Sequence, residues 1–492
     1  MKKLLSLLLV LSLLAALLVG CVKDPGTTPG TGGPGSGTPD QSTQTPGTTP
    51  TVTTWAINGV PLKDYAVVYA ASAPDYTARA AQYIANEIKA RTGLELPLHS
   101  DAEQATPLAH EIVVGESTRA ISTALNANTQ GVSFAVLADD AHVALEGEYF
   151  VIAAAAYYFV ETYIGAAPMW ASVAKEARVY QPITKENKNC IYLIGDGMGL
   201  NHTKLFETLS AASLSAYSDG EDVFYGSMLP NFGYISTNSL SGITDSAAAA
   251  TALASGYKTL NGYVGKDKDG NDTRTLTEIA IALGKSTAVL STDVITGATP
   301  AAFTAHTASR DDTAGILAAQ QTLASTHGTI LLGGYGEDYS ENAIKNRVER
   351  DFLDTLAELS KNEKGFFLMY EEAHFDKHSH ENDLEDTFRA ALRFNQIIAC
   401  AMEYAFYNPD TVVIITADHE TGGLTRSEDE STFLYTTTQH TNSYVPFYAF
   451  GAMMEVLHGL SLDNVQIPKT IAGMWNVTIT GNDNGSYPPL LP

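Results

Sequence analysis

The chain has 492 residues, of which 45% are hydrophobic, and it carries a formal net charge of −26. This length exceeds one ordinary domain, and the hydrophobic fraction is enough for a substantial core. The strong negative charge argues against a nucleic-acid partner, because there is no basic surface to meet phosphates. An acidic protein that acts on an anionic substrate needs a local positive source, which bound metal ions would supply.

The N-terminus has the pattern of an export signal. Two lysines precede the apolar run 4–18, which is too short to span a membrane comfortably. The following sequence, Leu18-Val19-Gly20-Cys21, resembles the lipobox of bacterial lipoproteins. We therefore expect residues 1–20 to be a signal peptide and Cys21 to be lipidated. The alternative is an ordinary signal peptide followed by an unrelated cysteine.

Residues 21–54 are rich in Pro, Gly and Thr and cannot bury a core, so they predict a solvated linker. With a lipid on Cys21, this linker would hold the folded part off a bacterial membrane, at the cell surface or in the periplasm. The sequence therefore predicts an extracytoplasmic, lipid-anchored protein.

Residues 55–180 predict a small α/β accessory domain that folds apart from the rest. Strand-like and helical patterns alternate there, and Gly93 marks the end of the first helix. The order of elements loosely resembles the small α/β domain that precedes the barrel in some glycoside hydrolases, which implies a carbohydrate or cell-wall contact. The expected elements are strands 65–69 and 111–115, a hairpin over 134–145, and helices 75–91 and 150–164.

From residue 186 to the C-terminus, apolar strands alternate with helical segments such as 384–406. This pattern predicts an α/β fold whose mostly parallel sheet carries helices on both faces. The expected strands are 191–195, 286–291, 365–370, 411–416 and 445–450.

Thr244-Asp245-Ser246 opens an alanine-rich helix. Thr244 is a candidate N-cap, which would place Ser246 in the first turn, where the positive end of the helix dipole favours anions. A serine there could act as a nucleophile. Because no general-base histidine is near in sequence, a metal is the expected activator. A capped, buried helix with no chemistry is the alternative for this stretch alone.

The two cysteines of the folded part, Cys190 and Cys400, lack the spacing of a metal site. Two buried thiols are expected, and a disulfide between them is the alternative in an extracytoplasmic compartment.

Acidic and histidine side chains recur just after the predicted strands. In a parallel sheet these strand ends converge on one edge, where ligand groups sit. Imidazole with carboxylate suits zinc, and carboxylate with hydroxyl suits magnesium. Arg310 offers a planar fork for two phosphate oxygens. The recurring residues are Asp196, Glu371, Asp376, His380, Asp418, His419 and His440.

Several phrases of this part resemble the alkaline phosphatase family, in the order in which the family has them. They are Gly195-Asp196-Gly197-Met198-Gly199, Thr244-Asp245-Ser246-Ala247-Ala248, Ala298-Thr299-Pro300-Ala301, Thr416-Ala417-Asp418-His419 and His440-Thr441. The resemblance covers about residues 186–480 and implies a catalytic domain over 186–492 with two Zn²⁺ and one Mg²⁺. It also implies that Ser246 becomes phosphorylated, with Arg310 binding phosphate and Asp245 holding Arg310. The implied ligands are Asp376, His380 and His440 for the first zinc, Asp418, His419 and Asp196 for the second, and Asp196, Thr299 and Glu371 for magnesium.

The chain departs from the family pattern at Gly297, where many members carry Asp or His, so the magnesium affinity is open. Lys377 is expected to contact phosphate through water. His374 and His378 are expected at the surface near the site rather than as ligands, and His306 is expected to be structural. Glu372 and Glu420 are expected either behind the ligands or at the surface.

The resemblance implies hydrolysis of small-molecule phosphate monoesters through a phosphoserine, by an enzyme that could be a homodimer. Phosphodiesters, sulfate esters or phosphonates are alternative substrates for the same metal site. A non-catalytic carbohydrate-binding lipoprotein is a further alternative, against which the intact set of ligand residues speaks.

Overall fold

A computed structural model describes residues 54–125, 132–179, 187–209, 223–339 and 347–479, apart from residues 166, 168, 172, 174, 175, 208, 430 and 453. The expected signal peptide, Cys21 and nearly all of the linker lie outside the described residues. The described residues all belong to one unit, Val52–Pro492. Among the described helices, none combines the length and apolar character that a membrane-spanning segment needs.

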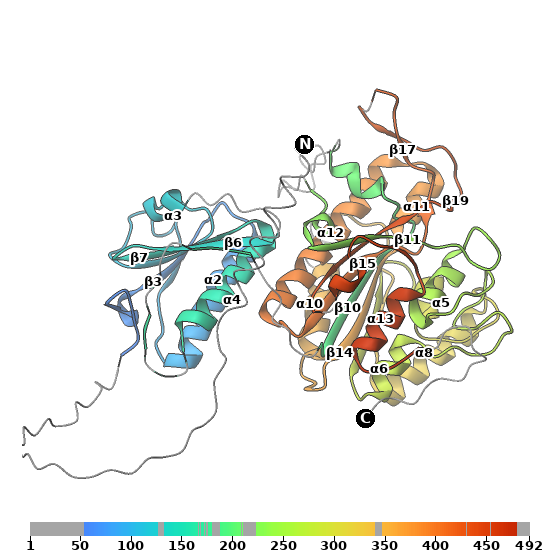
Figure 1. The fold of residues 1–492 in the computed structure, drawn as a ribbon, viewed down its shortest axis with the longest axis horizontal. Helices are drawn as coiled ribbons and strands as arrows, with labels where there is room; N and C mark the ends of the chain where they lie inside the picture. Colours follow the sequence, from blue (N-terminus) through green and yellow to red (C-terminus); the bar gives the residue numbers. More distant parts are fainter. Residues whose placement is uncertain are drawn as a thin grey trace, which may run out of the picture. The chain divides into compact units, whose positions relative to one another are not determined.

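The C-terminal part is built on an eight-stranded sheet in the order β13-β12-β14-β10-β15-β20-β11-β21 (Figure 1). The five strands from β13 to β15 run parallel, whereas β20 is antiparallel to both β15 and β11. The predicted mostly parallel α/β fold is thus confirmed. The strands are β10 (Asn189–Gly195), β11 (Asn231–Ser236), β12 (Ser286–Ser291), β13 (Ile330–Leu332), β14 (Phe366–Glu372), β15 (Thr411–Thr416), β20 (Val445–Phe450) and β21 (Ser461–Asp463).

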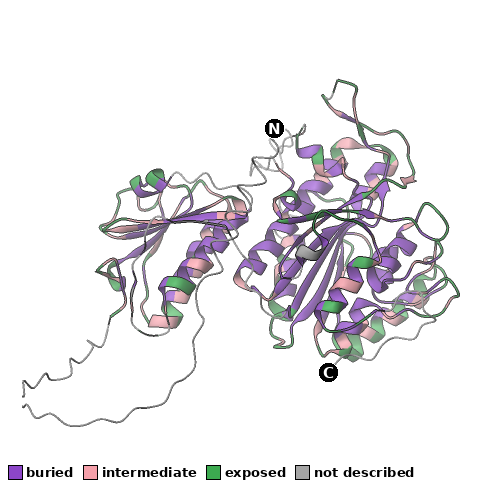
Figure 2. Cartoon of the chain, in the orientation of Figure 1, coloured by how far each residue is buried: buried purple, intermediate pink, exposed green. Residues whose placement is uncertain are grey.

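Helices cover both faces of this sheet, because its central strands are buried along their whole length and need an apolar layer on each side (Figure 2). Figure 1 shows α10 and α12 on one face and α5, α6, α8 and α13 on the other. The helices are α5 (Ser246–Ser255), α6 (Leu276–Ala282), α7 (Ala298–Ala302), α8 (Thr313–His327), α10 (Glu349–Leu359), α11 (His374–Glu381), α12 (Leu384–Tyr407) and α13 (Gln466–Met474). Two short hairpin-like pairs, β16 (Glu420–Thr421) with β19 (His440–Thr441) and β17 (Thr425–Arg426) with β18 (Phe433–Leu434), complete it.

The N-terminal part contains a six-stranded sheet in the order β4-β3-β5-β7-β6-β9. Gly93 ends α2 in the left-handed conformation, with φ 75°, as the sequence predicts. The expected hairpin is the antiparallel pair β6–β7. The elements are β1 (Ala56–Ile57), β2 (Val60–Pro61), β3 (Ala66–Tyr69), α2 (Asp75–Thr92), β4 (Leu98–Ser100), β5 (Glu111–Val114), α3 (Ala120–Leu125), β6 (Ser133–Ala138), β7 (His142–Gly147), α4 (Ile152–Tyr163), β8 (Trp170–Ala171) and β9 (Glu176–Val179).

Helix α12 also packs against the elements of the N-terminal part. Arg79 of α2 donates three hydrogen bonds, between 2.6 and 3.0 Å, to the carboxylate of Glu403. The rings of Tyr83 and Tyr407 stack with centroids 4.2 Å apart. The C-terminal half of α12 is therefore shared between the large sheet and the N-terminal part.

Cys190 lies in β10 and Cys400 in α12, and both are buried free thiols. The expectation of two buried thiols is confirmed, and the disulfide is not formed. Burial raises the pKa of both thiols, which keeps them protonated and unreactive.

Candidate active site

Ser246 is the first residue of α5 and is 4% exposed. The predicted N-cap at Thr244 is wrong, because the helix begins one residue later than that prediction requires. Asp245 is the N-cap, and its carboxylate accepts a hydrogen bond from the Ala248 N–H at 3.0 Å. The helix therefore presents the Ser246 hydroxyl at the positive end of its dipole, beside the carboxyl ends of the parallel strands.

Three imidazoles, those of His380, His419 and His440, have fixed orientations. They face the edge of the sheet beside Ser246, which we call the serine edge. The Nδ1 of His440 lies 2.8 Å from the carbonyl oxygen of Thr244, and the Nδ1 of His380 lies 2.6 Å from that of Thr438. A carbonyl oxygen can only accept, so each Nδ1 carries a proton, and in the neutral ring each Nε2 keeps a lone pair. Both rings are therefore oriented for metal ligation through Nε2.

Thr421 fixes the third imidazole in the same way. Its hydroxyl donates to Asp376 Oδ1 at 2.5 Å, so its oxygen is free to accept from the Nδ1–H of His419 at 3.1 Å. The Nε2 of His419 is then also a lone pair that points into the site. This threonine was not identified from the sequence, because only its contacts in space reveal its role.

Asp376, His380 and His440, the residues expected around the first zinc, are brought together. The two Nε2 atoms lie 3.1 Å apart, and each is 3.3 Å from Asp376 Oδ1. Two lone pairs and a carboxylate at this spacing repel one another unless a cation lies between them. Without a metal ion, hydrogen bonding to Asp376 favours a second proton on His380 and raises its pKa to about 9, so the group demands positive charge in either state. The donor set fits zinc.

Asp196, Asp418 and His419, expected around the second zinc, form a second group. His419 Nε2 lies 3.4 Å from Asp196 Oδ1, 3.2 Å from Asp418 Oδ2 and 3.3 Å from Ser246 Oγ. Among the described residues, neither carboxylate oxygen has a hydrogen-bond partner. Burial raises the pKa of both aspartates, that of Asp418 to about 7, and their neighbouring negative charges add to the shift. A bound cation would relieve this crowding and would touch the serine oxygen.

The third group contains oxygen donors only. Glu371, the last residue but one of β14, accepts a hydrogen bond from the Ser291 hydroxyl and faces Thr299 at the start of α7. Thr299 Oγ1 is buried and has no hydrogen-bond partner within the described part of the chain. Burial raises the pKa of Glu371, and the charge of Asp293 contributes in the same direction. With Asp196 nearby, this set suits a hard cation such as Mg²⁺.

Arg310 is partly exposed and is paired with Asp245, as the resemblance implies. Its Nη1 is 3.3 Å from Asp245 Oδ2, and the same oxygen accepts a hydrogen bond from the Gly262 N–H at 3.0 Å. The guanidinium is 38% exposed, so it can still bind an anion placed beside Ser246.

Two glycines that follow Asp196 allow its segment to lie directly against the segments that carry Asp376 and Glu420. Gly197 has φ +76°, and a Cβ there would lie 2.7 Å from the Cα of Asp376. A Cβ on Gly199 would lie 2.2 Å from the Cγ of Glu420. Only glycine fits at either position, and this is why Asp196 can approach ligands that follow more than 170 residues later.

His374, His378 and Glu420 are buried, so the expectation of surface positions is wrong for the two histidines. Arg393 of α12 lies beside His374, with its Nη2 2.8 Å from the Nδ1 of that ring. It is fully enclosed and forms a double ion pair with Glu372 at 2.6 Å, which holds the pKa of Glu372 to about 2 against its burial. His374 hydrogen-bonds to the same carboxylate at 3.2 Å. This group braces the end of β14, next to Glu371.

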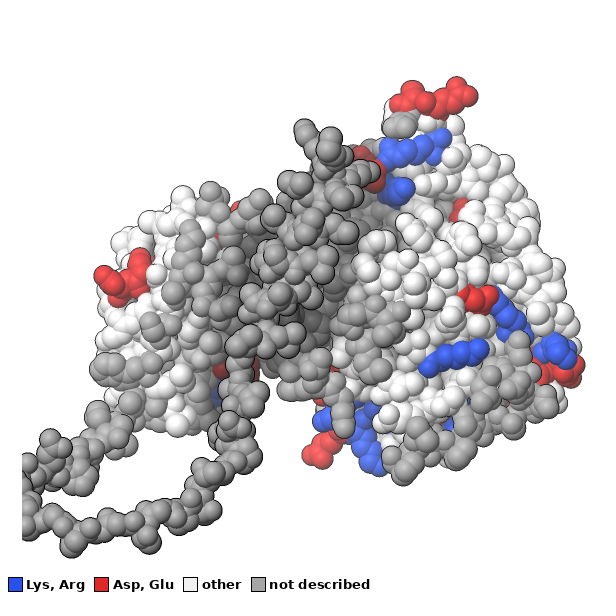
Figure 3. Space-filling view, viewed as in Figure 1, with Lys and Arg blue, Asp and Glu red and all other residues white. Residues whose placement is uncertain are grey.

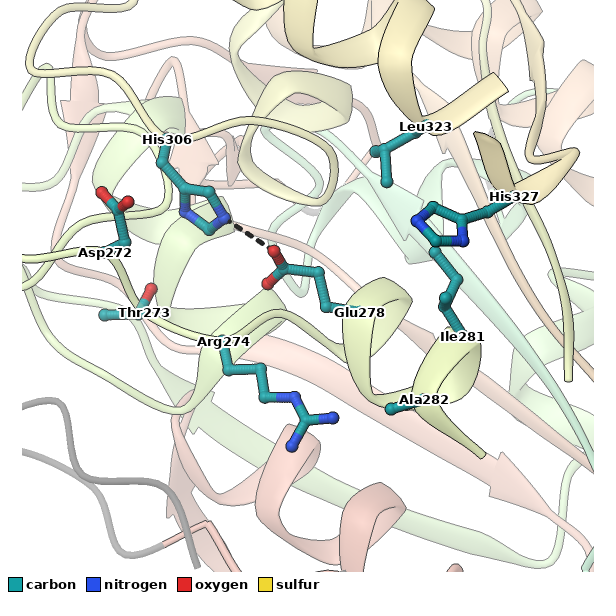
Figure 4. A pocket seen from close by; sticks show the side chains of 9 residues that line it. All are labelled: Asp272, Thr273, Arg274, Glu278, Ile281, Ala282, His306, Leu323 and His327. Atoms are coloured by element: carbon teal, nitrogen blue, oxygen red, sulfur yellow. Dashed lines mark hydrogen bonds and ion pairs between the residues drawn. The ribbon is translucent and has the colours of Figure 1, made fainter. Parts of the chain in front are cut away.

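His306 lies outside the serine edge, in a separate cavity of about 470 Å³ (Figure 4). Its Nδ1 bonds to the carbonyl of Gly265 at 2.7 Å and its Nε2 to Glu278 at 3.0 Å. Both ring nitrogens are used within the fold, which agrees with the structural role expected for this residue.

On the face shown in Figure 3, the lysine and arginine side chains of the described residues lie in small separate groups, several of them beside acidic side chains. The described residues of this face therefore offer no broad basic surface to an anionic substrate.

Comparison with known proteins finds similarity to alkaline phosphatases. The alkaline phosphatase family model matches residues 187–346 and 353–436. Alkaline phosphatase 4 of Bacillus subtilis is 30% identical over 294 residues, which are 49% of this chain and 63% of that protein. The alkaline phosphatase of Escherichia coli is 27% identical over 339 residues, which cover 48% of this chain and 70% of that protein. The crystal structure of a cold-active alkaline phosphatase from a Shewanella species shares the fold, with a TM-score of 0.50, 23% identity, and 58% of this chain and 99% of that chain covered.

The chain spans 63% of the length of two Bacillus subtilis relatives that it matches. The match covers the segments that carry the serine, the arginine and nearly all the candidate ligands, whereas His440 lies just beyond its last residue. Residues 187–346 and 353–436 of this chain are thus similar to the alkaline phosphatase family.

Proposed function

We propose that this protein hydrolyses phosphate monoesters and releases inorganic phosphate. The observation that carries the proposal is the convergence of Ser246 Oγ, Asp196 Oδ1 and Asp418 Oδ2 within 3.4 Å of one imidazole nitrogen, His419 Nε2. A buried serine beside two crowded carboxylates has chemical use only with a cation that offsets their charge.

In the proposed reaction, Arg310 binds two oxygens of the phosphoryl group and orients phosphorus toward Ser246. The Ser246 oxygen forms a bond to phosphorus as the bond to the ester oxygen breaks. The serine proton passes to solvent, and the departing alcohol oxygen takes up a proton. Water then attacks the phosphoserine, the serine oxygen regains a proton, and phosphate leaves. Two bound Zn²⁺ would favour the serine alkoxide and stabilise the departing oxygen.

The arginine favours monoesters over diesters. Arg310 claims two phosphoryl oxygens, and a diester has only two that are not esterified, so little charge remains for the cations. The test uses the purified, metal-loaded protein with p-nitrophenyl phosphate, bis(p-nitrophenyl) phosphate and p-nitrophenyl sulfate. Turnover is expected to be highest for the monoester. A preference for the diester or the sulfate would assign the same site to that substrate class instead, and no turnover of any of them would contradict the proposal.

We also propose that the protein works outside the cytoplasm and is anchored to a membrane by a lipid attached to Cys21. The lipobox-like sequence Leu18-Val19-Gly20-Cys21, which follows a short apolar run, supports this proposal. A Cys21→Ser variant should no longer be found in the membrane fraction of the cells. Unchanged fractionation, together with an unmodified N-terminal peptide by mass spectrometry, would contradict it.

A further inference from the structure

The sheet of the N-terminal part changes its direction of growth at β3. This strand pairs in parallel with β4 on one side and with β5 on the other, and β7 continues in parallel beyond β5. Helix α2 leads from β3 to β4, whereas α3 follows β5, and Figure 1 shows these two helices on opposite faces of the sheet. In open α/β sheets, such a switch point leaves a crevice at the carboxyl ends of the strands, where ligands bind.

A cavity of about 330 Å³ lies at this switch point. Its walls come from the carboxyl ends of the three parallel strands β3, β5 and β7, in the segments 72–77, 115–116 and 146–149. Gly115 has φ +81°, and a Cβ there would lie 2.7 Å from the Cγ2 of Thr77, so this glycine lets the first two segments pack closely. The volume is at the small end of the range for small-molecule sites and suits a ligand of one or two rings.

Three glutamates line this cavity, and none of the described residues that line it is a lysine, arginine or histidine. Glu146 is 5% exposed, and its Oε1 accepts a hydrogen bond from the Ser122 hydroxyl at 2.9 Å, which fixes its position. Glu116 and Glu148 are exposed, and burial together with the charge of Glu116 raises the pKa of Glu148. The cavity is therefore negatively charged, which disfavours an anionic ligand.

These carboxylates are not arranged as a metal site. Among the described residues, groups of three or more acidic, histidine or cysteine side chains with the spacing of metal ligands occur only at the serine edge. Ionised carboxylates can only accept hydrogen bonds, so the ligand has to donate. One ammonium group cannot serve carboxylates from separate segments, and hydroxyl groups on the same ligand would serve the others.

Two tyrosine rings supply the apolar part of the wall. Tyr76, in the first turn of α2, and Tyr149 are partly buried against the core. Tyr149 has φ +47°, a conformation that is rare for a bulky side chain and is found where the surroundings enforce it. Its ring lies 5.0 Å from that of Tyr225, centroid to centroid, which holds it in place. Aromatic faces suit the C–H face of a sugar ring and attract a nearby ammonium group.

We propose that this cavity binds an amino sugar. The protonated amine and the hydroxyl groups of the ligand donate to the three glutamates, and its ring lies against the two tyrosines. A neutral sugar lacks the charge that the carboxylates demand, and a simple amine lacks the hydroxyl donors. The site gives the N-terminal part a binding role of its own, which does not depend on the reaction at Ser246.

The test is titration calorimetry of the full chain at neutral pH and low salt, with the disaccharide of glucosamine as the probe. Binding is expected, and it should weaken as salt is added, because the attraction is between charges that salt screens. Maltose, which is neutral, and putrescine, which has amines without hydroxyl groups, should both bind more weakly than the probe. Digalacturonic acid, which is anionic, should not bind.

The glutamates at the surface give variants that leave the core intact. Glu148→Gln and Glu116→Gln should each weaken binding of the probe by about fivefold, the upper end for a partly exposed charge pair. Tyr76→Leu, which keeps an apolar group against the core, should weaken it as well. Asp140→Asn, an exposed aspartate of the same part outside the cavity, is the charge-matched control and should bind like the unmodified chain.

Absence of binding of the glucosamine disaccharide to the unmodified chain would overturn the proposal. So would unchanged affinity in the double variant Glu116→Gln, Glu148→Gln, because the probe would then lie elsewhere. Tighter binding of putrescine or of digalacturonic acid than of the probe would contradict the assigned ligand class. Each of these outcomes is independent of whether the protein hydrolyses p-nitrophenyl phosphate.

Discussion

Ser246 Oγ and His419 Nε2 lie 3.3 Å apart, although the two residues are separated by 173 positions in the chain. The imidazole presents a lone pair to the serine, since its other nitrogen is bound to Thr421. The first prediction concerns this contact. Ser246→Ala should abolish phosphoenzyme formation and lower kcat by about three orders of magnitude or more. Acid quenching with a labelled phosphoester locates the phosphate, and label on another residue would contradict the assignment.

Removal of metal should cost both activity and stability. Asp196 and Asp418 are buried side by side, so chelation leaves two carboxylates to be protonated or to repel. We expect a lower midpoint of thermal unfolding after chelation and its recovery with added Zn²⁺. Asp418→Asn removes one of the charges and should reduce the zinc-dependent rise in that midpoint. An identical midpoint with and without metal would argue against a metal centre at this edge.

Replacement of Asp245 and replacement of Arg310 should differ in their effect on the free energy of unfolding. Arg310→Ala should weaken inhibition by phosphate while the fold keeps its stability, because the guanidinium is partly exposed. Asp245→Ala should also remove the cap of α5, at a cost of about 1 kcal/mol in the free energy of unfolding. Denaturant titration and phosphate inhibition of both variants test this. Equal unfolding midpoints for the two would contradict the capping role.

The pair His306–Glu278 should make stability depend on pH. Burial disfavours both charges, but their mutual hydrogen bond lowers the pKa of Glu278 and raises that of His306. The stabilisation that ionised Glu278 adds to the free energy of unfolding is present above its unfolded-state pKa. It is lost as the pH falls through the lowered pKa of the folded state. The contribution of His306 is present below its unfolded-state pKa and lost as pH rises through its raised pKa.

His306→Gln should therefore destabilise the protein most at mildly acidic pH and least at alkaline pH. Thermal unfolding of this variant and of the unmodified protein across that range measures the difference. His327→Gln, which changes an exposed histidine of the same cavity, is the control. A constant difference at all pH values would show that the pair carries no linked proton.

A chain that begins near Thr184 should be less stable than the full chain. Without the N-terminal part, α12 would expose Tyr407 and leave the Glu403 carboxylate without Arg79. Lower solubility and a lower unfolding midpoint are expected, measured by size-exclusion chromatography and circular dichroism. A truncated chain that unfolds at the same midpoint would instead support an independently folding domain at residues 55–180.

Much of the fold could be predicted from the sequence, because short apolar runs bounded by polar residues define strands with little ambiguity. The observed bounds of β12, β15 and β20 are those predicted. Strand order and the reversed direction of β20 could not be predicted, since they depend on pairings between distant segments. The N-cap of α5 was predicted at Thr244 and lies at Asp245, because the helix begins one residue later than the local sequence suggests.

The candidate ligands were predictable because their residue types recur after strands. The groups that hold them were not. Thr421, Arg393 and Asp293 are ordinary residues in sequence, and their partners lie 45, 21 and 84 positions away. Only the folded chain shows that they orient an imidazole, brace a strand end and form an ion pair with Lys377.

The anchoring of the imidazoles through Nδ1 has a bearing on how the site is assembled. His440 and His380 take their orientation from backbone carbonyls, and His419 takes it from a threonine. These restraints come from the polypeptide itself, so folding alone sets the geometry of the nitrogen donors. Metal binding then requires little reorientation of these rings, so the chain itself, rather than the metal, decides which nitrogen of each imidazole faces the site.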